Sequence, residues 1–189
     1  NTIPMQFVRL GTSGDPSYNW GHTIDIIKSI SLCNKAIVVI TKHWNILTDN
    51  QIEALSGFGV CVNTSISALD SDKLIERRLS QYKRLKFYCK SVLRVVSCDF
   101  NLDNKIGARL SYVQDYLFNN ENVIDTVFRP SSNNIYIESG VINTAKKEFM
   151  SKKSIVSLYD KCAHLGYCNS CPDMCGAIGC NRDNQGRLF

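Results

Sequence analysis

Residues 36–66 read AIVVITKHWNILTDNQIEALSGFGVCVNTSI, and this segment contains a complete strand–helix–strand unit. AIVVIT and VCVNTSI are short runs rich in β-branched residues and bounded by turn residues, a pattern typical of strands. Between them, Thr48 or Asp49 is placed to cap a short helix through Leu55, and two glycines follow it. Two strands separated by one helix are expected to run parallel, with a right-handed crossover.

Similar units repeat along most of the chain. Strands are expected at 5–10, 36–41, 60–66, 92–97 and 123–128. Apolar residues at spacings of three and four predict helices from Asp70 or Ser71 to Leu85 and from Ile106 to Leu117. The repeat length of roughly 25 to 30 residues suits a TIM-type barrel, but a complete barrel takes about 250. The predicted fold is therefore α/β, with parallel βα repeats forming a partial TIM-type barrel.

The pattern weakens after residue 128. IYIE at 135–138 is expected to form one more strand, and helical segments precede a cysteine-rich tail. The predicted organisation is a partial barrel at 1–143 and a helical segment with a metal-binding tail at 144–189.

Composition narrows the class of protein. The 189 residues carry a formal net charge of +5, and no apolar run is long enough to span a bilayer. The cysteine count is odd, nine in all, and Cys61 and Cys98 lie in apolar runs, which favours a reducing compartment and a cytoplasmic protein. The densest basic group is expected to be a solvated helix face, with contact to an anionic partner as the alternative. It comprises Arg77, Arg78, Lys83, Arg84 and Lys86.

The tail segment KCAHLGYCNSCPDMCGAIGC holds five cysteines: Cys162, Cys168, Cys171, Cys175 and Cys180. Thiols this close on a loop with Gly, Asn and Pro can converge on one metal centre, and four thiolates suffice for zinc or for an iron–sulfur cluster. The expected ligands are Cys168, Cys171 and Cys175 with Cys162 or Cys180. Disulfides and free thiols are the alternatives, and His164 is interpreted as a packing or exposed residue.

Ligands of α/β sheets and barrels bind at the carboxyl ends of the strands, so polar residues there are candidate site residues. Ser13, Gly14 and Asp15 follow the first expected strand, in GTSGDP. A tight turn before a helix explains that segment equally well. Ser65 and Ser67 end the third expected strand, whereas His43, after the second, is interpreted as a surface or packing residue.

The order of these motifs resembles the middle of a radical S-adenosylmethionine (SAM) enzyme barrel. The motifs are a strand followed by GTSGDP, a strand ending in TK, a strand carrying NTSIS, and a strand with an arginine in VLRVVSCDFN. The resemblance covers roughly Met5 to Pro130. It implies that Ser13, Gly14 and Asp15 hold the methionine amino group of SAM, that Ser65 or Ser67 lies near the ribose, and that Arg94 meets the methionine carboxylate. A weaker similarity connects the chain to phage-associated and bacterial radical-SAM-like proteins.

One departure from that family is important. Its Cys-x3-Cys-x2-Cys loop, which holds the catalytic [4Fe–4S] cluster, has no counterpart in this sequence. Three explanations are open: the chain is a fragment, a partner subunit completes the site, or the radical chemistry has been lost. The resemblance favours an auxiliary [4Fe–4S] cluster for the late cysteines, whereas composition alone favours zinc.

Two hypotheses about function follow. The first is a radical-SAM-like iron–sulfur enzyme, or the barrel portion of one, that binds SAM and acts on an unknown substrate. Nucleic acid or a modified nucleotide is one conceivable target. The second is a non-catalytic, zinc-stabilised α/β binding module that contacts nucleic acid or protein.

Overall fold

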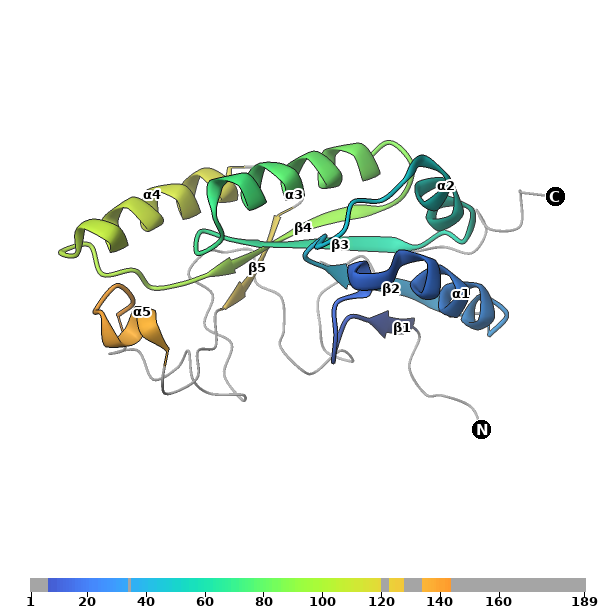
Figure 1. The fold of residues 1–189 in the computed structure, drawn as a ribbon, viewed down its shortest axis with the longest axis horizontal. Coiled ribbons are helices and arrows are strands. Elements are labelled where there is room, and N and C mark those ends of the chain that lie inside the picture. The colour runs from blue at the N-terminus through green and yellow to red at the C-terminus, as the bar shows by residue number, and fades with distance from the viewer. Residues whose placement is uncertain (1–6, 34, 120–122, 128–133, 144–189) are drawn as a thin grey trace. The chain divides into compact units, whose positions relative to one another are not determined.

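The computed structural model describes residues 7–33, 35–119, 123–127 and 134–143. Strands and helices alternate along these residues (Figure 1). The strands are β1 (Phe7–Leu10), β2 (Ala36–Thr41), β3 (Cys61–Ser67), β4 (Ser91–Ser97) and β5 (Val123–Val127). The helices are the 3-10 turn η1 (Pro16–Asn19), then α1 (Trp20–Ser31), α2 (Asp49–Gly57), α3 (Asp72–Leu85), α4 (Lys105–Phe118) and α5 (Ile135–Glu138). The α/β class and the five main strands are confirmed.

The strands form one parallel sheet in the order β1-β2-β3-β4-β5. Each strand is thus hydrogen-bonded to the strands that precede and follow it in the chain, and the register pairs Thr41 of β2 with Thr64 of β3. Among the described strands, β1 and β5 each have one neighbour, so closure into a barrel is not confirmed.

The chain groups into two compact units. Of the described residues, the first unit contains those up to Ser65 together with Glu76–Leu93, and the second contains Ile66–Ile75 together with those from Arg94 onward. The core of the first unit draws on α1, β2, α2, β3 and the end of α3. Its members include Ile27, Val39, Leu55, Val62 and Leu85. Helices on successive crossovers therefore pack on the same face of the sheet in this unit, as right-handed connections between neighbouring strands require.

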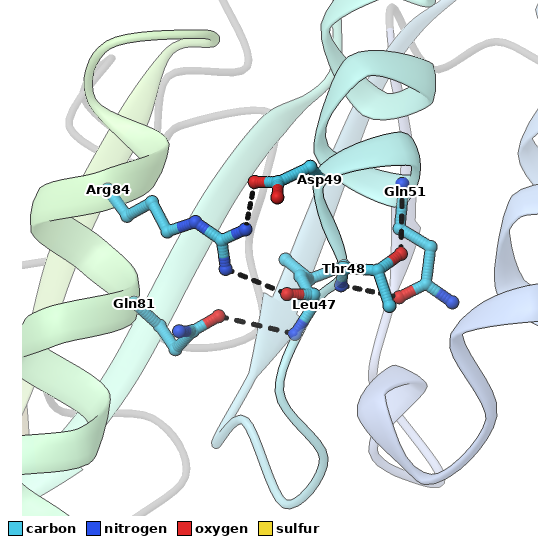
Figure 2. A network of polar contacts seen from close by, with 6 residues as sticks. All are labelled: Leu47, Thr48, Asp49, Gln51, Gln81 and Arg84. Carbon is cyan, nitrogen blue, oxygen red and sulfur yellow. Dashed lines mark hydrogen bonds and ion pairs between the residues drawn. The ribbon is translucent and has the colours of Figure 1, made fainter.

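Helix α2 begins where the sequence predicts. Thr48 is its N-cap, and a capping box is complete because Gln51 N–H donates to Thr48 Oγ1 while Thr48 N–H donates to Gln51 Oε1. Side chains of helix α3 bind the residues on either side of Thr48 (Figure 2). Arg84 Nη1 donates to Leu47 O at 2.8 Å, Arg84 also pairs with Asp49, and Gln81 Oε1 accepts from Leu47 N–H.

In the second unit, α4 is attached to the end of β4 through one side chain. Gln114 Oε1 accepts from Cys98 N–H at 2.7 Å, and Gln114 Nε2 donates to Cys98 O at 3.0 Å. The side-chain amide therefore satisfies the backbone there as a neighbouring strand would.

The prediction of a strand at 135–138 is wrong, because these residues form α5. Alternating apolar residues over four positions do not distinguish a strand from one helical turn. Asn134 decides between them here, since its side chain accepts from Tyr136 N–H as an N-cap. The helical segments and the tail expected after residue 143 lie outside the described residues.

No helix in the described ranges combines the length and the apolar character needed to cross a membrane.

Gly107 marks a close approach between α4 and the segment after β4. A Cβ at this position would lie 2.1 Å from the backbone oxygen of Asn101. Gly107→Ala is therefore expected to lower the free energy of unfolding by about 1–3 kcal/mol, the usual range for overpacking. Denaturant unfolding measures this change.

Gly57→Ala is the matched control, because a Cβ there meets nothing within 4 Å. Alanine in a helix is favoured by up to about 1 kcal/mol over glycine. A Gly107→Ala protein as stable as the Gly57→Ala protein would contradict the close approach.

Candidate functional site

A buried polar cluster lies at the carboxyl ends of β1, β2 and β3 in the first unit. It begins in the loop after β1, where Gly11 adopts φ +98° and where a Cβ would lie 2.1 Å from Ile40 O. Only glycine combines that backbone conformation with so close an approach. The loop is thereby held against β2, and it brings Asp15 to the end of that strand.

Asp15 is the centre of the cluster. Its Oδ1 accepts hydrogen bonds from Ser17 N–H at 2.9 Å, from Ser17 Oγ at 2.6 Å and from Thr41 Oγ1 at 2.7 Å. Its Oδ2 accepts from Lys42 N–H at 2.6 Å. Asp15 is thus the N-cap of η1, with Pro16 in the first turn, and also connects that turn to β2.

Burial raises the pKa of the Asp15 carboxyl, but the hydrogen bonds from Ser17, Lys42 and Thr41 outweigh it, and the pKa lies below its usual value. The ionised form is therefore the one that the folded protein stabilises. The turn interpretation of GTSGDP is confirmed, and the role of Asp15 in binding the SAM amino group stays a prediction.

The segment after β2 continues the cluster. Thr41 Oγ1 donates to Asp15 and accepts from His43 N–H at 2.9 Å. His43 adopts φ +49°, the left-handed conformation that costs a residue with a side chain free energy and that clusters at functional sites. Its side chain is completely buried, and Nε2 lies 2.9 Å from Oγ1 of Thr64 on β3.

Burial lowers the pKa of His43 to about 4; Asp15 opposes this shift, while Arg78 and Arg77 add to it. The imidazole is consequently neutral at physiological pH. The interpretation of His43 as a packing residue is confirmed by its burial. In addition, Thr41 connects its backbone N–H to Asp15, and its ring contacts Thr64.

Trp44 anchors the same segment from the other side. Its backbone N–H donates to Ser17 Oγ at 2.7 Å, and its ring stacks on Tyr18 with centroids 6.1 Å apart. The guanidinium of Arg78 lies over the Trp44 ring, 5.1 Å from the centroid, and Arg78 Nε donates to Lys42 O.

Arg78 is completely buried, so the expected solvated face of α3 is wrong at this residue. A basic side chain can be buried at the ends of strands when a carbonyl oxygen accepts its hydrogen bond and an aromatic ring lies against its charge.

A pocket of about 360 Å³ opens beside this cluster. The loop after β1 forms one wall, with Gly14 and Asp15, and α1 forms another, with His22 and Ile26. Two of the three residues predicted for the SAM amino group thus line one pocket, whereas Ser13 is not among its lining residues.

Ser65 and Ser67 lie on β3 and are half-buried. Ser67 Oγ donates to Val96 O at 3.2 Å and accepts from Leu69 N–H at 3.2 Å, and Ser67 N–H donates to the side chain of Asp70. Ser67 therefore helps to end β3, independently of any ligand.

Arg94 occupies β4 in the second unit and is largely buried. Its Nη2 donates to Thr126 Oγ1 on β5 at 2.9 Å. Beside it, Ser97 Oγ donates to Asp125 Oδ1 at 2.5 Å, and both residues are buried. Burial, with a contribution from the Asp125 charge, raises the pKa of Cys98 far above its usual value, so this thiol stays protonated.

The five tail cysteines predicted as metal ligands, Cys162, Cys168, Cys171, Cys175 and Cys180, lie outside the described residues, as does His164. Within the described residues, no group of three or more His, Cys, Asp or Glu is arranged to hold a metal ion. The described cysteines Cys33, Cys61, Cys89 and Cys98 form no disulfide.

Comparisons with protein-family models, with curated proteins and with solved structures found no match for this chain.

The sequence interpretation missed Trp44 and Arg78 as members of the cluster. One signal was present for its centre: Asp followed by Pro is the usual start of a helical turn. No local sequence pattern predicts that Arg78 is buried, because its partners Lys42 and Trp44 are distant in the sequence.

Asp15→Asn is expected to lower the free energy of unfolding by about 1–3 kcal/mol, the range for buried groups that lose a hydrogen-bond partner. Asparagine has one acceptor oxygen where the carboxylate has two. Its NH2 group would therefore face a donor, either Lys42 N–H or the groups that donate to Oδ1 in the wild-type protein. Denaturant unfolding tests this, with the exposed Asp103→Asn as control. Equal stability of the two variants would contradict the anchoring role of Asp15.

His43 predicts a pH dependence of stability. Its pKa is about 4 in the folded protein and near 6.5 when unfolded, so only the unfolded chain takes up a proton between these values. The free energy of unfolding is therefore highest, as far as His43 is concerned, above pH 6.5. It decreases as the pH falls towards 4, by about 3 kcal/mol over this range.

Unfolding free energies at several pH values from 7.5 to 4.5 measure this slope. His43→Asn should reduce it, since asparagine tolerates the left-handed backbone and does not titrate. His22→Asn, at an exposed position, is the control and should keep the slope. An unchanged slope in His43→Asn would show that other groups cause it.

Proposed function

We propose that this chain binds S-adenosylmethionine as the barrel portion of a radical-SAM-like iron–sulfur enzyme. The supporting observation is the strand order β1-β2-β3-β4-β5. A barrel requires every strand to lie beside its neighbours in the chain, whereas a doubly wound sheet reverses direction at a switch point. The described sheet has no such reversal.

The chemistry of β3 also supports the proposal. Val62 belongs to the helix-covered core, so Asn63, Ser65 and Ser67 lie on the opposite side of the strand, because side chains alternate. Asn63 is completely buried there. A run of polar side chains on the side away from the helices is expected where a strand faces a polar ligand, and is unusual for a face that only packs.

The cofactor groups fit the chain to different degrees. Asp15 already accepts four hydrogen bonds, so binding an ammonium group would add to a structural role. Arg94 donates from Nη2 to Thr126, and a methionine carboxylate would be a suitable acceptor for its guanidinium group. With a reduced iron–sulfur cluster, bound SAM supplies hydrogen-atom abstraction; the late cysteines remain the proposed ligands of an auxiliary cluster, with zinc as the alternative.

The alternative hypothesis, a binding module that contacts nucleic acid through a basic helix, has less support. It depends on the cationic face of α3, but Arg78 is buried and Arg84 pairs with Asp49. Phosphate contacts need accessible cations, and these two side chains are already engaged within the protein.

Arg94→Gln tests the proposal through the dissociation constant for SAM, measured by calorimetry under anaerobic conditions. The variant removes a charge-assisted contact to a carboxylate, so SAM should bind about tenfold more weakly or worse. Arg109→Gln is the control, because Arg109 is exposed and pairs with Asp72 on the surface. No binding of SAM by the wild-type protein, or equal affinity of the two variants, would contradict the proposal.

Metal analysis of the same preparation tests the cluster. Iron with acid-labile sulfide in the wild-type protein, reduced when the late cysteines are replaced by serine, is the expected result. Stoichiometric zinc without iron would contradict the iron–sulfur part of the proposal and favour the zinc alternative.

A further inference from the structure

One sequence pattern occurs twice at the amino-terminal edge of the sheet in the first unit. Residues 28–35, KSISLCNK, lead from the end of α1 to β2, and residues 83–90, KRLKFYCK, lead from the end of α3 to β4. Both segments have the spacing Lys-x3-apolar-x2-Lys. The residues concerned are Lys28, Leu32 and Lys35 in the first segment and Lys83, Phe87 and Lys90 in the second.

The apolar residue of each segment is exposed to solvent. Leu32 and Phe87 are both 87 % exposed, more than any other large apolar side chain in the part of the chain that the structure describes. The first lysine of each segment, Lys28 or Lys83, is also exposed, and it lies on the same helix side because it precedes the apolar residue by four positions. Single exposed apolar residues are common, but two at equivalent positions of one edge indicate an interaction surface.

The two segments belong to one surface. Because β2 and β4 are both neighbours of β3, their amino ends are about two strand spacings apart, roughly 10 Å. Residues 56–60, which connect α2 to β3, lie between them, and Ser56 Oγ donates to Tyr88 O at 2.5 Å. Ile30, Phe58 and Cys89 come from the three successive connections and pack against the same core cluster.

This edge carries positive charge. Residues 28–35 contain two basic residues, residues 83–90 contain four, and neither these segments nor residues 56–60 contain Asp or Glu. Arg84 pairs with Asp49 towards the start of α2, so the remaining basic residues are all lysines. The edge is therefore complementary to an anionic partner that also accepts apolar side chains.

We propose that this edge binds the surface of a membrane that contains anionic lipids. Leu32 and Phe87 insert among the lipid headgroups, where the boundary of the acyl chains accepts apolar side chains. The lysines on both sides of each apolar residue extend their charged ends to the anionic headgroups. Single-stranded nucleic acid fits this surface less well, because its bases stack on aromatic rings and Leu32 offers none.

The proposed surface is independent of SAM binding. Connections from a helix to the next strand lie at the amino ends of parallel strands, whereas Gly14, Asp15 and the rest of the polar cluster lie at the carboxyl ends. Contact with a membrane at one edge leaves the other edge accessible to a ligand. Failure of either proposal leaves the other intact.

The first experiment measures co-sedimentation of the wild-type protein with lipid vesicles. Vesicles with equal amounts of phosphatidylserine and phosphatidylcholine should bind it, and vesicles of phosphatidylcholine alone should bind it about tenfold more weakly or worse, because each lysine near an anionic surface contributes a factor of about five. No binding to either vesicle, or equal binding to both, would overturn the proposal. Displacement of the anionic vesicles by a single-stranded oligonucleotide that binds more tightly would assign the edge to nucleic acid and would overturn it as well.

The second experiment tests insertion of the apolar residues. Phe87→Ala should weaken binding to the anionic vesicles about tenfold, as expected when an aromatic side chain no longer leaves water. Tyr112→Ala removes an exposed aromatic ring from α4 and should keep the wild-type affinity. Both rings are exposed, so neither variant should alter the free energy of unfolding. Wild-type affinity in Phe87→Ala would overturn the proposal.

The third experiment tests the position of the charges on α3. Lys83→Gln should weaken binding to the anionic vesicles about fivefold. Lys73→Gln removes an equal charge from an exposed position at the other end of the same helix and should keep the wild-type affinity. Equal weakening in both variants would mean general electrostatic attraction and would overturn the proposed surface.

Discussion

The Asp15 carboxylate is the interaction on which the carboxyl ends of the first strands depend. Its two oxygens accept four hydrogen bonds from two segments: the η1 turn, through Ser17, and the end of β2, through Thr41 and Lys42. Thr41 extends this order to the backbone of His43, whose ring then contacts Thr64 on β3. One ionised side chain therefore fixes three neighbouring chain segments, because a carboxylate satisfies more donors than any neutral side chain can.

The strands and the α2 helix were predictable because their signals are local. β-branched runs, a Thr–Gln capping box and paired glycines each act over a few residues. The IYIE segment shows the limit, since its helical form depends on Asn134, just before the alternating pattern. The inward position of Arg78 was hardly predictable, because Arg78 meets residues that precede it by more than thirty positions and no local pattern specifies that pairing.

Helix α3 serves the first unit through polar contacts as well as through its apolar stripe. Arg78 reaches the end of β2, and Gln81 and Arg84 hold the start of α2 (Figure 2). These side chains satisfy backbone groups in a segment that has no strand partner of its own. A count of basic residues therefore overestimates the charge that α3 presents to a partner, since the guanidinium group of Arg78 is buried and that of Arg84 is paired with Asp49.

The two faces of β3 have different consequences for function. On the helix-covered side, Thr64 contacts the buried ring of His43, whose backbone N–H is connected to Asp15 through Thr41. On the other side, the alternation that places Asn63, Ser65 and Ser67 together results from the two-residue period of the strand. Substitutions on the helix-covered side should therefore act mainly through the stability of the protein and its pH dependence. Ser65, on the other side, carries no structural hydrogen bonds comparable to those of Asp15. A conservative substitution of Ser65 is therefore the more direct test of ligand binding.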